Sequence, residues 1–174
     1  MNGLKTSETG VLIFMGVAGS GKTTVARLFA EKTGAVFHEG DDFHPPENIA
    51  KMRAGIPLTD QDRAPWLLAL RKIIADALAR NIFTVLTCSA LKAKYREQLQ
   101  AGDRRVRLVY LTAPRTVLEA RLKTRSGHFM PPALLDSQLA SLEPPTDALT
   151  INWEKSPKEI VAEVIQTLGW ASKV

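Results

Sequence analysis

Residues 11–23 read VLIFMGVAGSGKT, an apolar run followed by glycines, a lysine and a threonine. The apolar run, Val11 to Met15, predicts a strand that is buried on both faces of a parallel sheet. After Lys22, apolar residues between Val25 and Phe29 have helical spacing, and Gly34 is placed to end that helix. The stretch therefore predicts a strand, a glycine loop and a helix in succession.

The residues that follow the predicted strand match the pattern G-x-x-x-x-G-K-[ST]; they are Gly16, Val17, Ala18, Gly19, Ser20, Gly21, Lys22 and Thr23. Glycines let backbone N–H groups close around phosphate oxygens, and the helix N-terminus adds positive potential. Lys22 is expected to reach the β- and γ-phosphates of a nucleotide, and the Thr23 hydroxyl is expected to bind Mg²⁺. The alternative is a glycine turn without function, which pattern and context together disfavour. This loop is therefore predicted to bind ATP with Mg²⁺.

Further strands are predicted at about 35–38, 82–87, 106–111 and 148–152, each followed by a helical pattern. This alternation favours an α/β fold with three layers, α/β/α, on a mostly parallel sheet. Pro65 is predicted to lie in the first turn of a long helix. Ser156 is the predicted N-cap of the last helix, and Glu159 completes a capping box there. The chain is expected to form a single domain, residues 1–174.

Composition excludes several classes of protein. The 45% apolar and 24% charged content is that of a folded globular domain rather than a disordered or fibrous chain. The formal charge of +5 favours an anionic partner, but no basic stripe with interleaved aromatic residues predicts nucleic-acid binding. No apolar segment is long enough to cross a membrane. Cys88 is the single cysteine, which suits a reducing compartment, so a cytoplasmic location is expected.

Two acidic residues stand at the end of the second predicted strand. Ligands in doubly wound sheets bind outside the carboxyl ends of the strands, so these acids should face the phosphate loop. Asp41 is the candidate base that takes the proton of an acceptor hydroxyl as the γ-phosphoryl group leaves ATP. Glu39 is a candidate to help hold Mg²⁺ through water. The alternative for both acids is helix capping or simple exposure to solvent.

Several strings beyond the phosphate loop resemble those of the gluconokinases, P-loop kinases related to shikimate and adenylate kinases. They are Gly40-Asp41 with His44-Pro45; Asn48 with Lys51-Met52; GIPLTDQDRAPWL at 55–67; Cys88-Ser89-Ala90-Leu91-Lys92 with Tyr95-Arg96; and Arg121-Leu122 with RSGHF at 125–129. The match keeps order and spacing from about Val11 to Pro145. The resemblance implies ATP-dependent phosphorylation of D-gluconate at the 6-hydroxyl, giving 6-phospho-D-gluconate and ADP. It also implies a nucleoside-kinase-like fold and a homodimer.

Gluconate carries a carboxylate and several hydroxyls, so its site should combine cations with hydrogen-bonding groups. The residues expected to bind it are Asp41, His44, Arg53, Arg63, Lys92, Arg96 and His128, several of them in a substrate-binding insertion at about 40–80. Arg63 is expected to hold the carboxylate, because a planar guanidinium can form two parallel bonds with it. The alternative is that Asp60, Asp62 and Arg63 cap the following helix.

Two arginines lie in the first part of a predicted mobile lid at about 121–135. Arg121 and Arg125 lie four positions apart, on one face of a predicted helix. Closure of the lid could bring both arginines onto the phosphates, neutralising charge in the transition state and excluding water. The alternative is that they form only a solvated helix face.

Three other functions would require sequence features that differ from those found. A shikimate kinase should lack the strings at His44-Pro45 and at 60–66, and a nucleoside monophosphate kinase should offer a base pocket lined by aromatic or amide groups. A nucleotide-dependent switch of the GTPase type should carry an Asn-Lys-x-Asp motif, which this sequence lacks.

The histidines and Cys88 do not have the spacing of zinc ligands.

Overall fold

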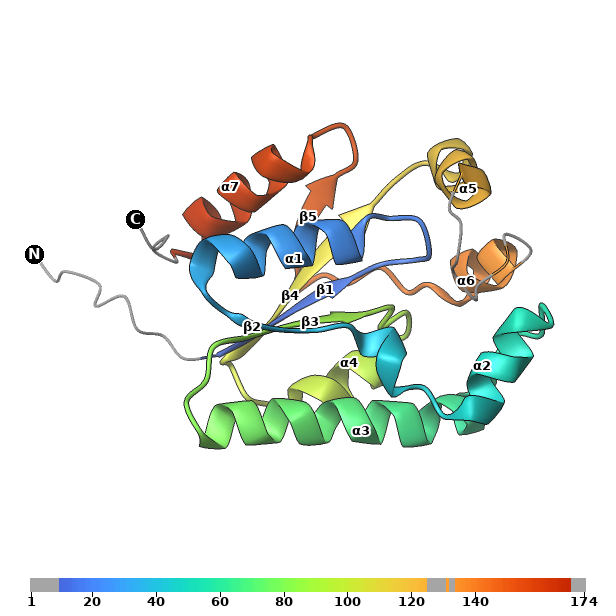
Figure 1. The fold of residues 1–174 in the computed structure, drawn as a ribbon, viewed down its shortest axis with the longest axis horizontal. Helices are drawn as coiled ribbons and strands as arrows, with labels where there is room; N and C mark the ends of the chain where they lie inside the picture. The colour runs from blue at the N-terminus through green and yellow to red at the C-terminus, as the bar shows by residue number, and fades with distance from the viewer. Residues whose placement is uncertain (1–9, 125–130, 132–133, 170–174) are drawn as a thin grey trace, which may run out of the picture.

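The computed structural model of the chain describes residues 10–124, 131 and 134–169 (Figure 1). Its elements in chain order are β1 (Val11–Met15), α1 (Lys22–Thr33), β2 (Val36–His38), the 3-10 helix η1 (Gly40–Phe43), α2 (Pro46–Arg53), α3 (Asp60–Ala79), β3 (Thr84–Cys88), α4 (Ala93–Gln100), β4 (Val106–Thr112), α5 (Arg115–Thr124), α6 (Leu135–Ser141), β5 (Leu149–Asn152) and α7 (Pro157–Leu168). The predicted α/β fold is confirmed.

A single five-stranded sheet in the order β2-β3-β1-β4-β5 forms the middle layer. All four strand pairings are parallel, as the alternation of strands and helices predicts. Helices α1 and α7 cover one face of the sheet, and α3 and α4 cover the other (Figure 1). The carboxyl ends of the five strands therefore meet at one edge, where the loops before α1, η1 and α4 lie side by side.

Side chains of β1 supply both halves of the core, which explains why the strand is apolar throughout. Val11, Ile13 and Met15 pack with α3 and α4. Leu12 and Phe14 pack with α1 and α7 on the opposite face. Successive residues of a strand point to opposite faces, so a strand covered on both sides favours apolar side chains at every position.

The prediction for Pro65 is wrong, because α3 begins earlier than expected. Thr59 is its N-cap: the Thr59 hydroxyl accepts a hydrogen bond from the Asp62 N–H at 3.1 Å, and Asp62 accepts one from the Thr59 N–H at 2.9 Å. This capping box places Pro65 in the second turn of α3. The predicted box of Ser156 and Glu159 is present at the start of α7.

Several boundaries also differ from the predictions. The third strand begins at Thr84 rather than near Ile82. The helix after this strand, α4, begins only at Ala93. Helices α2 and α6 were not foreseen as separate elements. None of the helices in the described part of the chain combines the length and the apolar character needed to cross a bilayer.

Candidate active site

The loop between β1 and α1 surrounds a hollow large enough for a nucleotide's phosphates. Gly16 and Gly21 have φ angles of 144° and 96°, which side chains on L-residues disfavour, and a Cβ on Gly16 would lie 2.5 Å from the Leu111 carbonyl oxygen. The hollow has a volume of about 360 Å³ and is lined by Ala18, Gly19, Gly21, Lys22, Thr23, Thr24, Asp41, Ser89, Arg121, Thr124 and Gln138. Most of the predicted phosphate loop thus faces one space.

Two cations contact this loop directly. The Lys22 Nζ donates a hydrogen bond to the Val17 carbonyl oxygen at 3.0 Å, inside the loop that it is expected to serve. Arg121, near the end of α5, donates to the Gly19 carbonyl oxygen at 3.3 Å. Arg121 therefore lies beside the phosphate loop. Arg125 and His128 lie outside the described residues.

The chain turns sharply after β2 and presents Asp41 to the same hollow. Gly40 lies so close to β3 that a Cβ on it would be 1.9 Å from the Thr87 carbonyl oxygen. Its N–H donates to the Thr87 hydroxyl at 2.9 Å, and its carbonyl accepts from the Trp66 indole N–H at 2.7 Å. Glu39 accepts a hydrogen bond from the Thr87 hydroxyl. These contacts of Gly40 thus fix the backbone position of Asp41, the next residue.

A second, smaller hollow adjoins the first. Its interior has a volume of about 30 Å³, room for one or two water molecules, and it is partly open to solvent. Its lining is Asp41, His44, Met52, Pro57, Leu58, Arg63, Trp66, Ser89, Leu134, Ser137 and Gln138. Asp41, Ser89 and Gln138 belong to both linings, so they stand where the two spaces meet. We call the larger space the nucleotide hollow and the smaller one the acceptor hollow.

His44 forms a wall of the acceptor hollow as a neutral imidazole. Burial lowers the pKa of His44 to about 4, although Asp41 opposes the shift, and the Arg63 charge lowers it further. The His44 Nε2 lies 3.9 Å from the Asp41 carboxylate, and Nδ1 lies 3.3 Å from the Asn48 side-chain amide. At neutral pH His44 can therefore hydrogen-bond an acceptor without adding charge.

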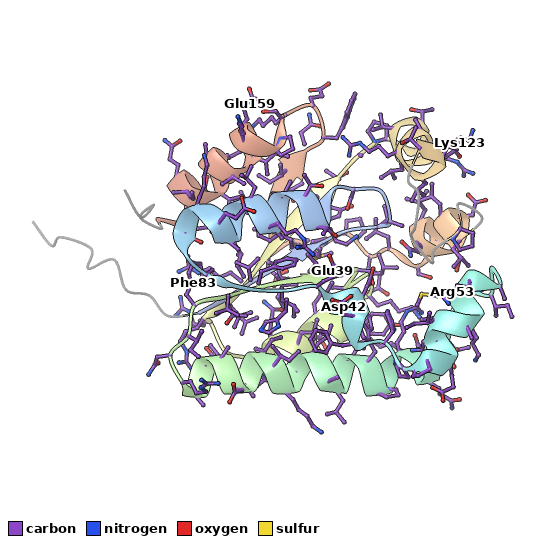
Figure 2. All side chains as sticks on the ribbon, in the orientation of Figure 1. Glu39, Asp42, Arg53, Phe83, Lys123 and Glu159 are labelled. Atoms are coloured by element: carbon purple, nitrogen blue, oxygen red, sulfur yellow. The ribbon has the colours of Figure 1, made fainter. Side chains whose placement is uncertain are left out.

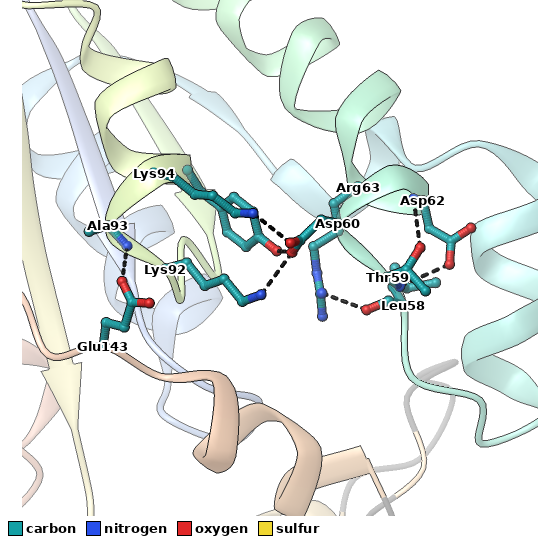
Figure 3. A network of polar contacts seen from close by, with 10 residues as sticks. Leu58, Thr59, Asp60, Asp62, Arg63, Lys92, Ala93, Lys94 and Glu143 are labelled. Atoms are coloured by element: carbon teal, nitrogen blue, oxygen red, sulfur yellow. Dashed lines mark hydrogen bonds and ion pairs between the residues drawn. The ribbon is translucent and has the colours of Figure 1, made fainter.

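Arg63 supplies positive charge to the acceptor hollow. Its guanidinium donates to the Leu58 carbonyl oxygen at 2.6 Å and lies 5.8 Å from the centre of the Tyr95 ring. Figure 3 shows this side chain beside the Asp60 cluster described next. Arg63 thus reaches the acceptor hollow from the first turn of α3, and its position is fixed by the Leu58 carbonyl and the Tyr95 ring.

Asp60 binds two lysines at the start of α4. Lys92 and Lys94 pair with its carboxylate at 2.9 and 2.5 Å, and the Tyr95 hydroxyl also donates to it (Figure 3). These contacts hold the pKa of Asp60 well below its usual range, with the Lys94 hydrogen bond as the largest cause. The cluster joins the start of α3 to the start of α4. Lys92 is bound in this cluster and lines neither hollow.

Two other predicted substrate residues also lie outside both linings. Arg96 is buried and donates to the carbonyl oxygens of Ala90 and Leu91 at 3.0 and 3.1 Å. Arg53 is exposed on the last turn of α2 (Figure 2). Figure 2 also labels Glu39 and Asp42, which lie near the carboxyl edge of the sheet. The structure thus brings Asp41, His44 and Arg63 together, but not Arg53, Lys92 and Arg96.

The sequence reasoning missed Gln138. Its Oε1 accepts a hydrogen bond from the Ala18 N–H of the phosphate loop at 2.7 Å. Apolar residues Leu134, Leu135, Leu139 and Leu142 have helical spacing, which could have indicated α6. Nothing in that pattern indicates that the polar residue between them faces the phosphate loop.

The donors of the nucleotide hollow fit Mg²⁺ bound together with a nucleotide. Thr23 offers a hydroxyl in the first turn of α1, and Lys22 neighbours it. Within the described residues no group of three or more histidine, cysteine and acidic side chains gathers into a metal cage. Mg²⁺ in nucleotide sites is held by few protein oxygens and by the substrate phosphates, so such a cage is not needed for the Thr23 hydroxyl to serve as one of its ligands.

Comparison with known proteins agrees with this geometry. A family model described as an AAA domain matches residues 11–145. A gluconokinase of Gluconobacter oxydans is 46% identical over 158 residues, 89% of each chain. The thermoresistant gluconokinase of Escherichia coli is 38% identical, over 91% of this chain and 93% of its own.

Solved structures give the same result. A sugar kinase from Janibacter sp. HTCC2649 is 43% identical with a TM-score of 0.87, over 94% of this chain and 96% of its own. A gluconokinase from Sinorhizobium meliloti 1021 is 42% identical with a TM-score of 0.82, over 92% of each chain. Shikimate kinase from Bacteroides thetaiotaomicron is 18% identical with a TM-score of 0.65, over 92% of this chain and 98% of its own, which shows a shared fold alone.

Proposed function

Because the chain belongs to the gluconokinase family of P-loop kinases, we propose that it transfers the γ-phosphoryl group of ATP to the 6-hydroxyl of D-gluconate. The products are 6-phospho-D-gluconate and ADP. One observation carries the proposal: Asp41 lines both the nucleotide hollow and the acceptor hollow. A carboxylate at that junction is where a base for phosphoryl transfer to a hydroxyl has to stand.

The phosphate loop and its neighbours bind the donor. Backbone N–H groups of the loop surround the phosphates, and Lys22 turns from the Val17 carbonyl to the β- and γ-phosphates. Thr23, helped by Glu39, would hold Mg²⁺, which would neutralise phosphate charge. Arg121, already beside Gly19, adds positive charge as the γ-phosphoryl group transfers, and Arg125 is proposed to join it.

Asp41 orients the acceptor and takes its proton. The 6-hydroxyl oxygen forms a bond to the γ-phosphorus while the bond from that phosphorus to ADP breaks, and the hydroxyl proton passes to the Asp41 carboxylate. Arg63 pairs with the carboxylate of gluconate, and neutral His44 hydrogen-bonds a hydroxyl. Roles for Arg53, Lys92, Arg96 and His128 in substrate binding stay predictions, as do the homodimer and the cytoplasmic location.

An acceptor panel tests the proposed function. ADP release is measured with D-gluconate, shikimate and a nucleoside monophosphate at matched concentrations, together with direct detection of 6-phospho-D-gluconate. We expect turnover with gluconate to exceed turnover with the other two acceptors. Lys22→Ala is the control for background activity, because it removes the charge that draws the γ-phosphoryl group toward the acceptor. Faster turnover with shikimate or the monophosphate would refute the assignment.

A further inference from the structure

Gln138 joins helix α6 to the phosphate loop. The side chain is 8% exposed, and its Oε1 accepts a hydrogen bond of 2.7 Å from the Ala18 N–H, 120 positions earlier in the chain. A backbone N–H can only donate, so the side-chain atom that faces it is the amide oxygen. A buried N–H without an acceptor is costly, which makes this bond a firm constraint on the loop.

The N-terminal end of α6 also covers the acceptor hollow. Leu134, four positions before Gln138, packs with Met52 of α2 and with Leu58. Leu135 packs on the other side, with Val17 and Ala18 of the phosphate loop. One short helix therefore rests on the phosphate loop and on the apolar cover of the acceptor hollow at once.

Binding of the acceptor acts on this cover. The acceptor hollow is partly open, but its interior has room for only one or two water molecules, less than a six-carbon sugar acid needs. Leu134, Met52 and Leu58 line this hollow, so a sugar acid bound there presses on Leu134. Because Leu134 is the N-cap of α6 and Gln138 lies four positions further along, a shift of Leu134 also acts on the bond to Ala18.

We propose that Gln138 is a positioning residue that couples closure of the acceptor hollow to the geometry of the phosphate loop. The inference rests on the proposed function, since it concerns the same transfer. With the Gln138–Ala18 bond in place, α6 is seated and the loop is fixed, so that a bound acceptor rather than water occupies the junction beside Asp41 and Ser89. Without the bond, a water oxygen attacks the γ-phosphorus in place of the acceptor hydroxyl, and ADP and inorganic phosphate form together with a proton.

Two substitutions separate the bond from mere packing. Gln138→Leu keeps a similar volume but removes the acceptor for the Ala18 N–H. Gln138→Glu keeps an oxygen at the same distance along the side chain, so the bond survives although a negative charge is added near the phosphates. Gln98→Leu, the same change at an exposed position of α4, is the matched control.

The deciding measurement is the number of ADP molecules released per 6-phospho-D-gluconate formed. We expect a value of about one for the wild type, Gln98→Leu and Gln138→Glu, and a clearly higher value for Gln138→Leu. The kcat of Gln138→Leu should fall by about 10–100-fold, the loss expected when reacting groups are slightly misplaced. Thermal unfolding of each variant shows whether the chain is folded under assay conditions.

The outcomes are distinct from those of the acceptor panel. Failure of the wild type on gluconate refutes the proposed function, and the ratio of ADP to product is then measured on the acceptor that the panel identifies. A folded Gln138→Leu variant with an unchanged ratio overturns the role of Gln138. So does a Gln138→Glu variant that releases as much excess ADP as Gln138→Leu, since the surviving bond would then not restore coupling.

Discussion

The imidazole of His44 stacks on the indole of Trp66, with ring centroids 4.2 Å apart and planes inclined by 14°. Trp66 is itself fixed, because its N–H donates to the Gly40 carbonyl oxygen. The stack removes His44 from water and leaves Asp41 as the nearest opposite charge, 3.9 Å away. The histidine that faces the acceptor is therefore kept neutral by its packing.

This packing predicts a pH dependence of stability. The pKa of His44 is about 4 in the folded chain against an ordinary 6.5, so the unfolded chain binds more protons between these values. Stability from neutral His44 is thus complete above about pH 6.5 and is lost as the pH falls toward 4, up to roughly 3 kcal/mol. Urea unfolding from pH 7 to 4 should show a steeper loss for the wild type than for His44→Gln.

His38→Gln is the control for the His44 experiment, because it removes a histidine from β2 outside the acceptor hollow. Its difference from the wild type should stay the same across the pH range or change much less than that of His44→Gln. Parallel curves for the wild type and His44→Gln would contradict the assignment of a neutral, buried His44.

Gly40→Ala should destabilise the fold by about 3 kcal/mol or more, because the new methyl group would overlap the Thr87 carbonyl, which is backbone and cannot turn away. Gly55→Ala is the matched control. Gly55 has open space around it but a φ of 73°, so that change measures only the cost of a left-handed conformation, about 1–2 kcal/mol. Urea unfolding gives both values, and equal losses would show that close approach at Gly40 is unimportant.

Much of the site could be predicted because it depends on local pattern. The strand, glycine loop and helix at residues 11–33 appear as predicted, since an apolar run, left-handed glycines and a C-terminal Gly34 each act within a few residues. The position of Asp41 also follows from topology, because parallel strands place their carboxyl ends at one edge. A sequence motif at the carboxyl end of a strand therefore determines most of the residues that face the nucleotide hollow.

Contacts between distant segments could not be predicted from the sequence. Arg96 and Lys92 carry the charge that a sugar acid needs, but the Ala90 and Leu91 carbonyls bind the first and Asp60 binds the second. The sequence shows which residues are cationic. It does not show which of these cations are already bound to backbone carbonyls or to a carboxylate. Gln138 illustrates the reverse case, a polar residue in an ordinary helix that meets a loop 120 positions away.

Asp41→Asn should reduce kcat by about 10²-fold or more while ATP binding is kept, because an amide cannot take the acceptor proton. Nucleotide affinity measured by calorimetry and steady-state turnover with gluconate separate the two effects. Asp42→Asn, the neighbouring acid in η1 that lies outside both linings, is the control. If kcat survives and only the KM for gluconate rises, Asp41 binds the acceptor without serving as base.

Arg63→Lys tests how the acceptor's carboxylate is recognised. Lysine keeps the charge but loses the planar pair of donors, and it also loses the hydrogen bond to the Leu58 carbonyl. The KM for gluconate should therefore rise, whereas ATP binding should be unchanged. A variant with wild-type KM would show that a point charge is sufficient and that the bidentate pair is not formed.

Sorbitol supplies the complementary test from the side of the substrate. It has the chain length and hydroxyls of gluconate but no carboxylate, so the Arg63 guanidinium would lose its partner in the closed hollow. Arg63 is half-buried, and leaving its guanidinium without a carboxylate beneath a bound acceptor costs about 1–3 kcal/mol, which corresponds to at least a several-fold loss in kcat/KM for the wild type. The discrimination should shrink in Arg63→Lys, because the geometry that penalises the missing carboxylate is already gone. Equal kcat/KM values for sorbitol and gluconate in the wild type would mean that no cation binds the acceptor's carboxylate. Recognition of the acceptor would then have to come from the hydroxyl contacts around His44 and Asp41.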